Sequence, residues 1–163
     1  GDIGNGRMMI GSIAKSMRDG SAAGLLLLSL AACSTAAQAA SYTMYRDAGC
    51  GCCLEWADHA AAGLEAEVKA ENADMQMVKD LHGVPDNLRA CHTMIVEGYV
   101  IEGHVPAEAI QKLLREKPEN VVGLAVPGMP VGSPGMEYQD QKQPYQVIAF
   151  GPKGQRVFAS YNQ

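Results

Sequence analysis

Three cysteines, the most reactive side chains of the sequence, lie within four residues at Cys50-Gly51-Cys52-Cys53. An apolar run typical of a strand, residues 42–45, precedes them, and a run with helical periodicity, residues 54–68, follows. Thiols at the start of a helix lie beside unpaired backbone N–H groups and the positive end of the helix dipole, and both favour thiolate over thiol. Because the thiolate is the nucleophilic and metal-binding form of sulfur, we expect this segment to perform metal or redox chemistry.

A further thiol, Cys91, occurs later in the chain and is followed directly by His92. Soft thiolate ligands select Cu(I), zinc or iron–sulfur clusters. Zinc requires four closed ligands, and a set that takes two clustered cysteines with Cys91 and His92 leaves Cys52 unused. Cu(I) uses the surplus better, because one thiolate can bridge two ions and neighbouring thiolates can build a small cluster. The pattern therefore favours copper over zinc.

Two other uses of these thiols stay open. A Cys-x-x-Cys pair beside a helix start is typical of a thiol oxidoreductase, in which Cys50 or Cys52 would be the nucleophile. Cys53 or Cys91 would then resolve the mixed disulfide. In an oxidising compartment the thiols of the mature chain can also form two structural disulfides. Adjacent Cys52 and Cys53 argue against this, since Cys91 is the one distant thiol available to receive a bridge.

The beginning of the chain has the features of an export signal. Residues 24–32 form an apolar run preceded by basic residues, and the run is shorter than the roughly 20 residues that a membrane span needs. Cleavage after Ala37-Gln38-Ala39 would leave Ala40 as the N-terminus, whereas Leu30-Ala31-Ala32-Cys33 resembles a lipobox that would leave Cys33 lipidated. We therefore predict an export segment at 1–39, a domain at 40–163 and a periplasmic location, with membrane attachment only through a lipid anchor at Cys33.

The composition narrows the function classes. With 163 residues, 47% of them hydrophobic and 19% charged, the chain is long enough and apolar enough for one globular domain. The formal net charge is −5, and lysine and arginine do not cluster along the sequence. Nucleic acid and anionic membrane surfaces are therefore poor candidates for partners.

The elements expected around the thiols alternate as β-α-β-α-β-β-α. With the thiols where the first strand meets the first helix, this order predicts an α/β, thioredoxin-like domain with a mixed sheet and flanking helices. A Gly/Pro-rich loop and a closing hairpin extend it at the C-terminus. The expected strands are 41–46, 67–70, 93–96, 99–102, 146–150 and 156–161, with a hairpin turn at Glu97-Gly98. The first expected helix is 54–68, with an apolar stripe of Leu54, Ala57, Ala61, Leu64 and Val68. The second is 75–81, after the N-cap Asp74, and the third is opened by Pro106.

Three further side chains are candidate metal ligands. His104 follows the second hairpin strand, where it can reach the thiols or a second ion. His92 is expected to be structural, because neighbouring side chains in an extended segment point to opposite faces, away from each other. The Gly/Pro-rich loop carries Met129 and Met136, whose thioethers suit Cu(I), although anchoring of the loop in the core explains them equally well.

Four motifs occur in order along the chain: Cys50-Gly51-Cys52-Cys53 with Trp56 and His59, Cys91-His92-Thr93, residues 98–106 and residues 126–137. From about Tyr42 to the C-terminus the sequence thereby resembles the CopG-type family of exported bacterial metal-binding proteins associated with copper resistance. The resemblance implies a thioredoxin-like fold and a copper site. It carries over as ligands Cys50, Cys52, Cys53 and Cys91, with His104, Met129 and Met136 as further candidates.

We therefore predict an exported copper(I)-binding protein of copper homeostasis and resistance that holds copper, as a multinuclear cluster, through clustered cysteine thiolates. Other exported copper-handling proteins are its expected partners. The alternative is a thioredoxin-like thiol-disulfide oxidoreductase, or a copper redox protein that uses the same cysteines.

Overall fold

The computed structural model describes residues 38–163. The predicted signal run, both processing sites and Cys33 lie wholly or mostly outside the described residues, and the export segment stays a prediction. Within residues 38–163, no helix is long and apolar enough to cross a membrane.

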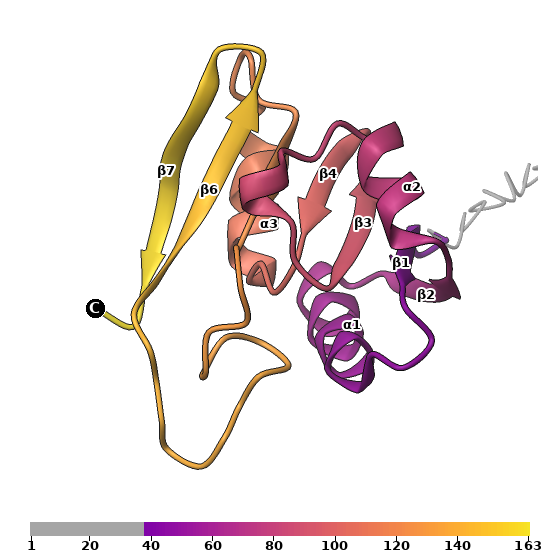
Figure 1. Ribbon diagram of the computed structural model, residues 1–163, viewed down its shortest axis with the longest axis vertical. Coiled ribbons are helices and arrows are strands. Elements are labelled where there is room, and N and C mark those ends of the chain that lie inside the picture. The colour runs from indigo at the N-terminus through magenta and orange to yellow at the C-terminus, as the bar shows by residue number, and fades with distance from the viewer. Residues whose placement is uncertain (1–37) are drawn as a thin grey trace, which may run out of the picture. The chain divides into compact units, whose positions relative to one another are not determined.

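One mixed sheet of seven strands runs through the described domain in the order β2-β1-β3-β4-β5-β6-β7 (Figure 1). β1 pairs with β2 in parallel and with β3 antiparallel, and β3 pairs antiparallel with β4. With the helices between them, these four strands have the plan of a thioredoxin-like domain, as predicted. The strands are β1 Ser41–Arg46, β2 Glu67–Asn72, β3 His92–Val96, β4 Tyr99–Glu102, β5 Gly123–Ala125, β6 Tyr145–Gly151 and β7 Gly154–Tyr161.

The last three strands extend the sheet beyond this plan. β5 joins β4 in parallel, and β5, β6 and β7 continue as antiparallel neighbours. The segment between β5 and β6 is the long loop that carries Met129 and Met136 (Figure 1). The predicted C-terminal loop and hairpin are therefore both present.

The helices cover both faces of the sheet. They are α1 Gly51–Leu64, α2 Met75–Leu81 and α3 Ala107–Glu116, with a short 3-10 turn at Asp86–Leu88. α1 and α3 pack on the face that presents Met94 and Ile101, and they approach so closely that a Cβ on Gly63 would overlap the side chain of Ala107. Because side chains alternate along a strand, Thr93 and Glu102 face the other side, where α2 lies.

Local signals set the ends of several elements. Asp74 caps α2 by accepting hydrogen bonds from the backbone N–H groups of Gln76, at 3.0 Å, and Met77, at 3.2 Å. Glu97 and Gly98 both have positive φ, 47° and 86°, in the tight turn between β3 and β4. These two predictions are confirmed.

The buried face of α1 differs from the predicted stripe. Leu54 is 43% exposed, whereas Cys53 and Trp56 are fully buried. The helix begins at Gly51 and turns Trp56 inward, where the indole N–H donates a 2.9 Å hydrogen bond to the Val105 carbonyl. The large apolar area of this ring decides which face of the helix is buried.

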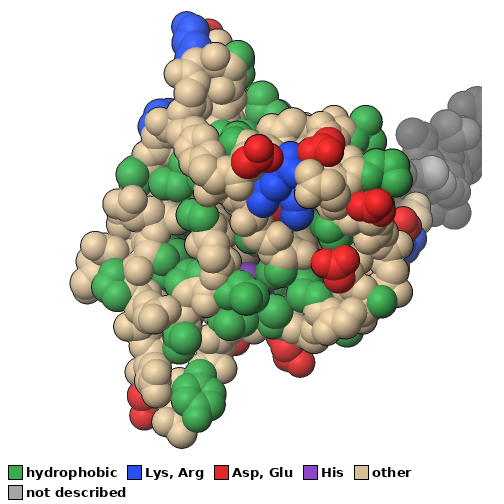
Figure 2. All heavy atoms as spheres, in the orientation of Figure 1, with side chains coloured by type: hydrophobic (Ala, Val, Ile, Leu, Met, Phe, Trp, Pro, Cys, Tyr) green, Lys and Arg blue, Asp and Glu red, His purple; other side chains and the backbone are tan. Residues whose placement is uncertain are grey.

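The surface shown in Figure 2 carries acidic and basic side chains intermixed, with hydrophobic side chains scattered among them. On this face the basic residues do not gather into a patch of the kind that binds nucleic acid.

Candidate metal centre

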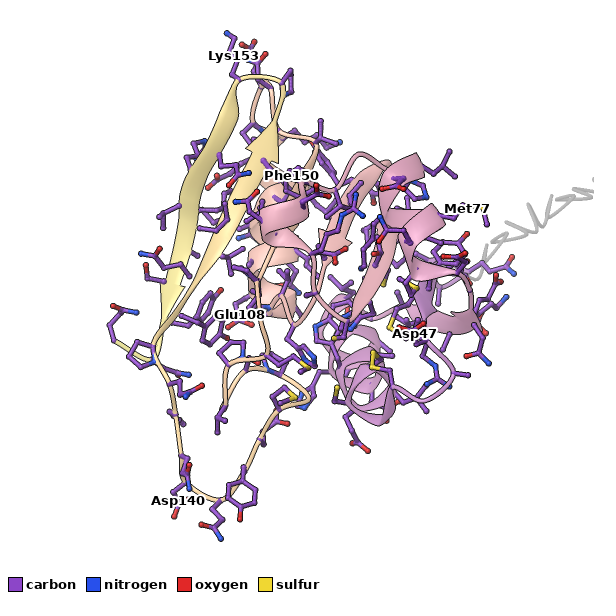
Figure 3. The ribbon with its side chains drawn as sticks, in the orientation of Figure 1. Asp47, Met77, Glu108, Asp140, Phe150 and Lys153 are labelled. Carbon is purple, nitrogen blue, oxygen red and sulfur yellow. A yellow bond between two sulfur atoms is a disulfide. The ribbon has the colours of Figure 1, made fainter. Side chains whose placement is uncertain are left out.

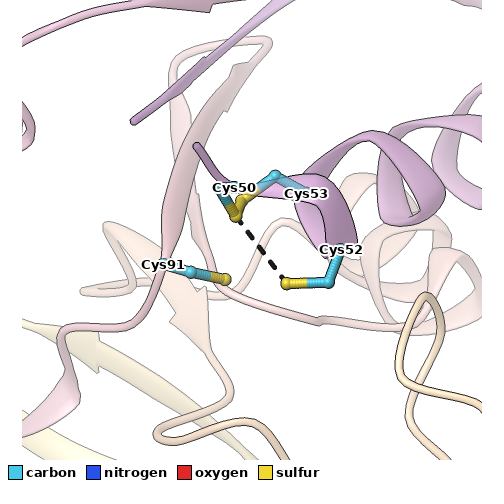
Figure 4. Close-up of side chains that lie close together, drawn as sticks. All are labelled: Cys50, Cys52, Cys53 and Cys91. Atoms are coloured by element: carbon cyan, nitrogen blue, oxygen red, sulfur yellow. Dashed lines mark hydrogen bonds between the residues drawn. A yellow bond between two sulfur atoms is a disulfide. The ribbon is translucent and has the colours of Figure 1, made fainter. Parts of the chain in front are cut away.

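Four cysteine side chains of the described domain gather at the start of α1, where Figure 3 shows a concentration of sulfur atoms near Asp47. The Sγ atoms of Cys50, Cys52, Cys53 and Cys91 all lie within 4.8 Å of one another. Cys50 is the N-cap of α1, and the next two lie in its first turn. Cys91 precedes β3 and approaches from the opposite side (Figure 4). The structure thus brings together the four thiols that the sequence analysis singled out.

Two of these cysteines are oxidised. Cys50 and Cys53 form a disulfide with Cα atoms 5.5 Å apart, whereas Cys52 and Cys91 are free thiols. The Sγ of Cys52 lies 3.7 Å from that of Cys50. These four cysteines therefore form one disulfide, not the two structural disulfides of the alternative considered above.

Arg46 shapes the turn that presents the first cysteine. Its Nη1 donates to the backbone carbonyl of Cys50 at 2.8 Å and to those of Asp47 and Ala48 at 3.3 Å. The backbone N–H of Cys50 donates in turn to the Asp47 carbonyl at 3.0 Å. These contacts hold the turn between β1 and α1 in one conformation, so the position of Cys50 follows from the end of β1.

Cys91 lies between two histidines. Its Sγ is 3.2 Å from Nε2 of His104 and 3.2 Å from Nδ1 of His92. The prediction that His104 reaches the thiols is confirmed. The expectation that His92 points away from Cys91 is wrong, because β3 begins at His92 and Cys91 lies in the bend before it. The alternation of an extended strand therefore does not apply to this pair.

Burial controls the protonation of this group. Desolvation is the main cause that raises the pKa of the Cys91 thiol, to about 12, and the neighbouring Cys52 adds to it. Burial also lowers the pKa of His104, and it lowers the pKa of His92 well below its ordinary value. Without a metal ion, a neutral thiol therefore lies between two neutral imidazoles at neutral pH.

A buried polar network, not anticipated from the sequence, supports Cys91 from the side of α2. Oε1 of Glu102 accepts from Nζ of Lys79 at 2.5 Å and from the backbone N–H of Ala90 at 2.6 Å. Oε2 accepts from the Thr93 hydroxyl at 2.6 Å. Lys79, Thr93 and Glu102 are buried residues, at most 5% exposed. Thr93 and Glu102 interrupt the apolar residues of two adjoining strands, and this is the one sequence signal that could have indicated a buried partner for Lys79.

The loop between β5 and β6 lies against the start of α1. A Cβ on Gly135 would be 2.7 Å from the backbone N of Trp56 and 3.0 Å from the Cys52 carbonyl. Met136, the next residue, is half-buried, whereas Met129 is 53% exposed and lines a groove with Pro127, Pro130 and Tyr145. The structure thus places the segment of Met136 near the thiols, while Met129 lies on the surface. The roles of both as ligands stay predictions.

His59 makes a second connection to the same loop. It lies on the exposed face of α1, as expected, and its Nε2 is 2.9 Å from Oε1 of Glu137.

Replacing Gly135 by alanine tests how tightly this loop is held. The variant Gly135→Ala combines positive φ, 81°, with a collision against the backbone of α1, and we expect it to lower the free energy of unfolding by roughly 2–4 kcal/mol. Gly128→Ala is the matched control, because φ is 76° and nothing lies within 4 Å of its Cβ. Gly128→Ala should lower the free energy of unfolding by only about 1–2 kcal/mol. Equal losses in urea denaturation would show that the loop does not press on α1.

Comparison with known proteins identifies the family. A family model described as "Protein of unknown function, DUF411" matches residues 88–136. A solved structure titled "Copper resistance protein copG- Form 2" is 44% identical, covers 76% of this chain and 99% of its own, and superposes with a TM-score of 0.69. The chain belongs to the CopG family. A structure titled "Copper resistance protein copG- Form 1" is 42% identical over 77% of this chain and 100% of its own, with a TM-score of 0.68. Among curated proteins no match was found.

The segment matched by the DUF411 model, residues 88–136, contains one part of the candidate metal centre. It includes Cys91, His92 and His104, and it ends at Met136. It omits α1, which carries the three clustered cysteines. The candidate centre is therefore assembled from the DUF411 segment on one side and the β1–α1 turn on the other.

Proposed function

We propose that this member of the CopG family is an exported copper(I)-binding protein that protects the cell from excess copper by holding several ions at its clustered cysteines. The observation that carries the proposal is the convergence of four cysteine Sγ atoms within 4.8 Å of one another. The titles of two solved relatives, both copper resistance proteins, support copper as the cargo.

The donor set fits Cu(I) better than zinc. Thiolates are soft ligands that bridge Cu(I) ions readily, and four of them from two segments are enough to build a small cluster. A closed mononuclear zinc site would use the same four sulfurs once each and gain nothing from His104 beside them. His104, Met136 and Met129 are the additional ligands we propose, in decreasing order of support from their positions.

Copper binding by all four cysteines requires the disulfide to be opened. An external dithiol reductant, which is itself oxidised to a disulfide, supplies the two electrons and two protons that convert the Cys50–Cys53 disulfide to two thiols. These thiols lose their protons when they bind Cu(I). We therefore propose that the thiol-reduced protein is the form that takes up copper. A periplasmic location, with the signal segment at 1–39, belongs to the same proposal, because the periplasm is where such a disulfide forms.

A Cu(I) titration tests the proposal. The reduced full chain, titrated anaerobically against a strong Cu(I) chelator, should retain more than one Cu(I) per chain. The protein with its Cys50–Cys53 disulfide intact should retain fewer ions, since half of the clustered sulfurs are then unavailable. Uptake of one zinc ion without copper uptake in this competition would contradict the proposal.

The disulfide also supports a second candidate function, a thiol-disulfide oxidoreductase. Cys50 and Cys53 form the Cys-x-x-Cys pair at a helix start that such enzymes use, and the free thiol of Cys52 lies 3.7 Å from Cys50. A disulfide-reductase assay on the metal-free protein separates the two functions. Turnover comparable to that of a general reductase would favour the enzyme, whereas background turnover with intact copper binding would favour the copper protein.

A further inference from the structure

We propose that Cys91, His92 and His104 form a second, mononuclear metal site that binds one borderline divalent first-row ion, such as Zn(II) or Cu(II), while Cys50 and Cys53 are joined in their disulfide. This site goes beyond the Cu(I) cluster proposed above. It shares Cys91 and His104 with that cluster but uses His92 in place of the other cysteines, and it differs in the charge of its ion and in the redox form of the protein that carries it.

The donor atoms are spaced as a metal ion requires. Sγ of Cys91 is 3.2 Å from one nitrogen of each histidine, and one donor atom from each of the three residues lies within 4.8 Å of the others. Metal–sulfur and metal–nitrogen bonds of about 2.3 and 2.0 Å, at near-tetrahedral angles, place sulfur and nitrogen roughly 3.5 Å apart. An ion therefore fits among the three donors with small side-chain shifts.

The hydrogen bonds of the metal-free group are incomplete. Nδ1 of His104 donates to the Pro134 carbonyl at 2.7 Å, so its Nε2 presents a lone pair to Cys91. Nε2 of His92 is buried and has no hydrogen-bond partner.

Neither tautomer of His92 gives every polar atom of this group a hydrogen-bond partner. With the proton on Nδ1, its buried Nε2 keeps a bare lone pair. With the proton on Nε2, the single thiol proton of Cys91 has to serve two imidazole lone pairs at once. With the proton of His92 on Nε2, a cation can accept the lone pairs of His92 Nδ1 and His104 Nε2 together with the thiolate of Cys91, in place of the one shared thiol proton.

The surroundings hold both rings in fixed orientations. The Pro134 carbonyl sets the tautomer of His104, as carbonyls commonly do behind metal-bound histidines. The ring of His92 packs at 4.3 Å from Trp56 and at 5.1 Å from His104, between centroids. Trp56 is itself anchored by its hydrogen bond to Val105. These contacts leave the two imidazoles little freedom to turn away from an ion.

The chemistry of the donors selects the class of ion. Two neutral imidazoles and one thiolate suit borderline divalent ions, with affinity rising toward Cu(II) and falling at Zn(II). None of the three residues belongs to the disulfide, so the site is available in the oxidised protein. Cys91 is also only half-buried, which gives an ion a route to the otherwise enclosed histidines. Since Cys91 serves both sites, reduction and Cu(I) binding would take this ligand from the divalent ion.

Cobalt(II) is the probe for this site, because it reports thiolate ligation in its absorption spectrum and does not oxidise thiols as Cu(II) can. The full chain with its disulfide intact, in a Cys33→Ser background, is titrated anaerobically with Co(II) alone. We expect one Co(II) per chain, with a sulfur-to-cobalt charge-transfer band and the visible bands of a four-coordinate ion. One equivalent of Zn(II) should displace it.

Single variants identify the ligands. His92→Ala and His104→Ala should each lower Co(II) affinity at least 10-fold, and Cys91→Ser should remove the charge-transfer band. His59→Ala, on the exposed face of α1, is the matched control and should bind as the parent does. His92→Gln provides a second test should the alanine variant fail to fold. Unchanged affinity in a folded His92 variant, or cobalt binding without the sulfur band, would overturn the proposal. The Cu(I) count of the reduced parent distinguishes that failure from a failure of the proposed function.

Discussion

Replacing Cys91 by serine should reduce Cu(I) binding by the reduced protein from several ions to at most one. The other three clustered cysteines lie on one short segment, Cys50 to Cys53, whereas Cys91 approaches from the opposite side before β3. Without its sulfur, a cluster has no thiolate to close it on that side. Serine preserves the size of the side chain but gives a hard oxygen that binds Cu(I) poorly. The measurement is an anaerobic Cu(I) titration against a chelator, with bound copper counted per chain.

The chain offers a matched control in its fifth cysteine. Cys33→Ser removes a thiol outside the described residues and should leave the copper count unchanged. His104→Ala should give an intermediate result, weaker binding or the loss of one ion, because its Nε2 lies 3.2 Å from Cys91 Sγ. Retention of the full complement by Cys91→Ser would confine the site to Cys50, Cys52 and Cys53 and refute the two-sided arrangement.

Replacing Lys79 by methionine should lower the free energy of unfolding by about 3–5 kcal/mol, since it leaves the carboxylate of Glu102 buried without its cation. Both residues are at most 5% exposed, and the ammonium group of Lys79 also donates to the Thr93 hydroxyl at 3.0 Å. Urea denaturation of the metal-free protein measures the loss. Copper affinity should fall as well, because Glu102 holds the backbone of Ala90, directly before Cys91.

Two comparisons make the test specific. Lys69→Met removes the cation of a surface pair whose side chains are more than half exposed, and it should change stability by no more than about 0.5 kcal/mol. Lys79→Met combined with Glu102→Leu should cost less than the sum of the single changes, because it removes the unpaired charge together with its partner. Additive losses, or a loss at Lys79 no larger than at Lys69, would show that the pair contributes little.

Features that depend on a few neighbouring residues could be predicted from the sequence. The cap at Asp74 and the turn at Glu97-Gly98 are formed within a single turn of chain, so their residue types are sufficient to identify them. The order of strands and helices gave the thioredoxin-like plan, and the C-terminal hairpin followed from two β-rich runs around a Gly/Pro turn. The spacing of Cys50, Cys52 and Cys53 at a helix start indicated thiol chemistry for the same local reason.

Which residues these elements pack against is decided by the tertiary structure. The periodicity of α1 placed Leu54 inside and overlooked Trp56, because the buried face depends on what the sheet and His92 present to the helix. The buried pair of Lys79 and Glu102 joins residues 23 positions apart. The interruption of apolar strand residues at Glu102 indicates a buried polar group, but it does not name Lys79 as its partner.

The candidate site likewise has features that the sequence predicted and features that only the tertiary structure decided. The residue types alone indicated a soft metal and named the four cysteines and His104. Which two sulfurs are joined was decided by the fold, as was the bend that turns Cys91 toward His92. The pairing of a thiol with distant imidazoles depends on where β3, β4 and the loop to Pro134 meet. That meeting point follows from strand register and loop packing, interactions between segments that the linear pattern of residues does not contain.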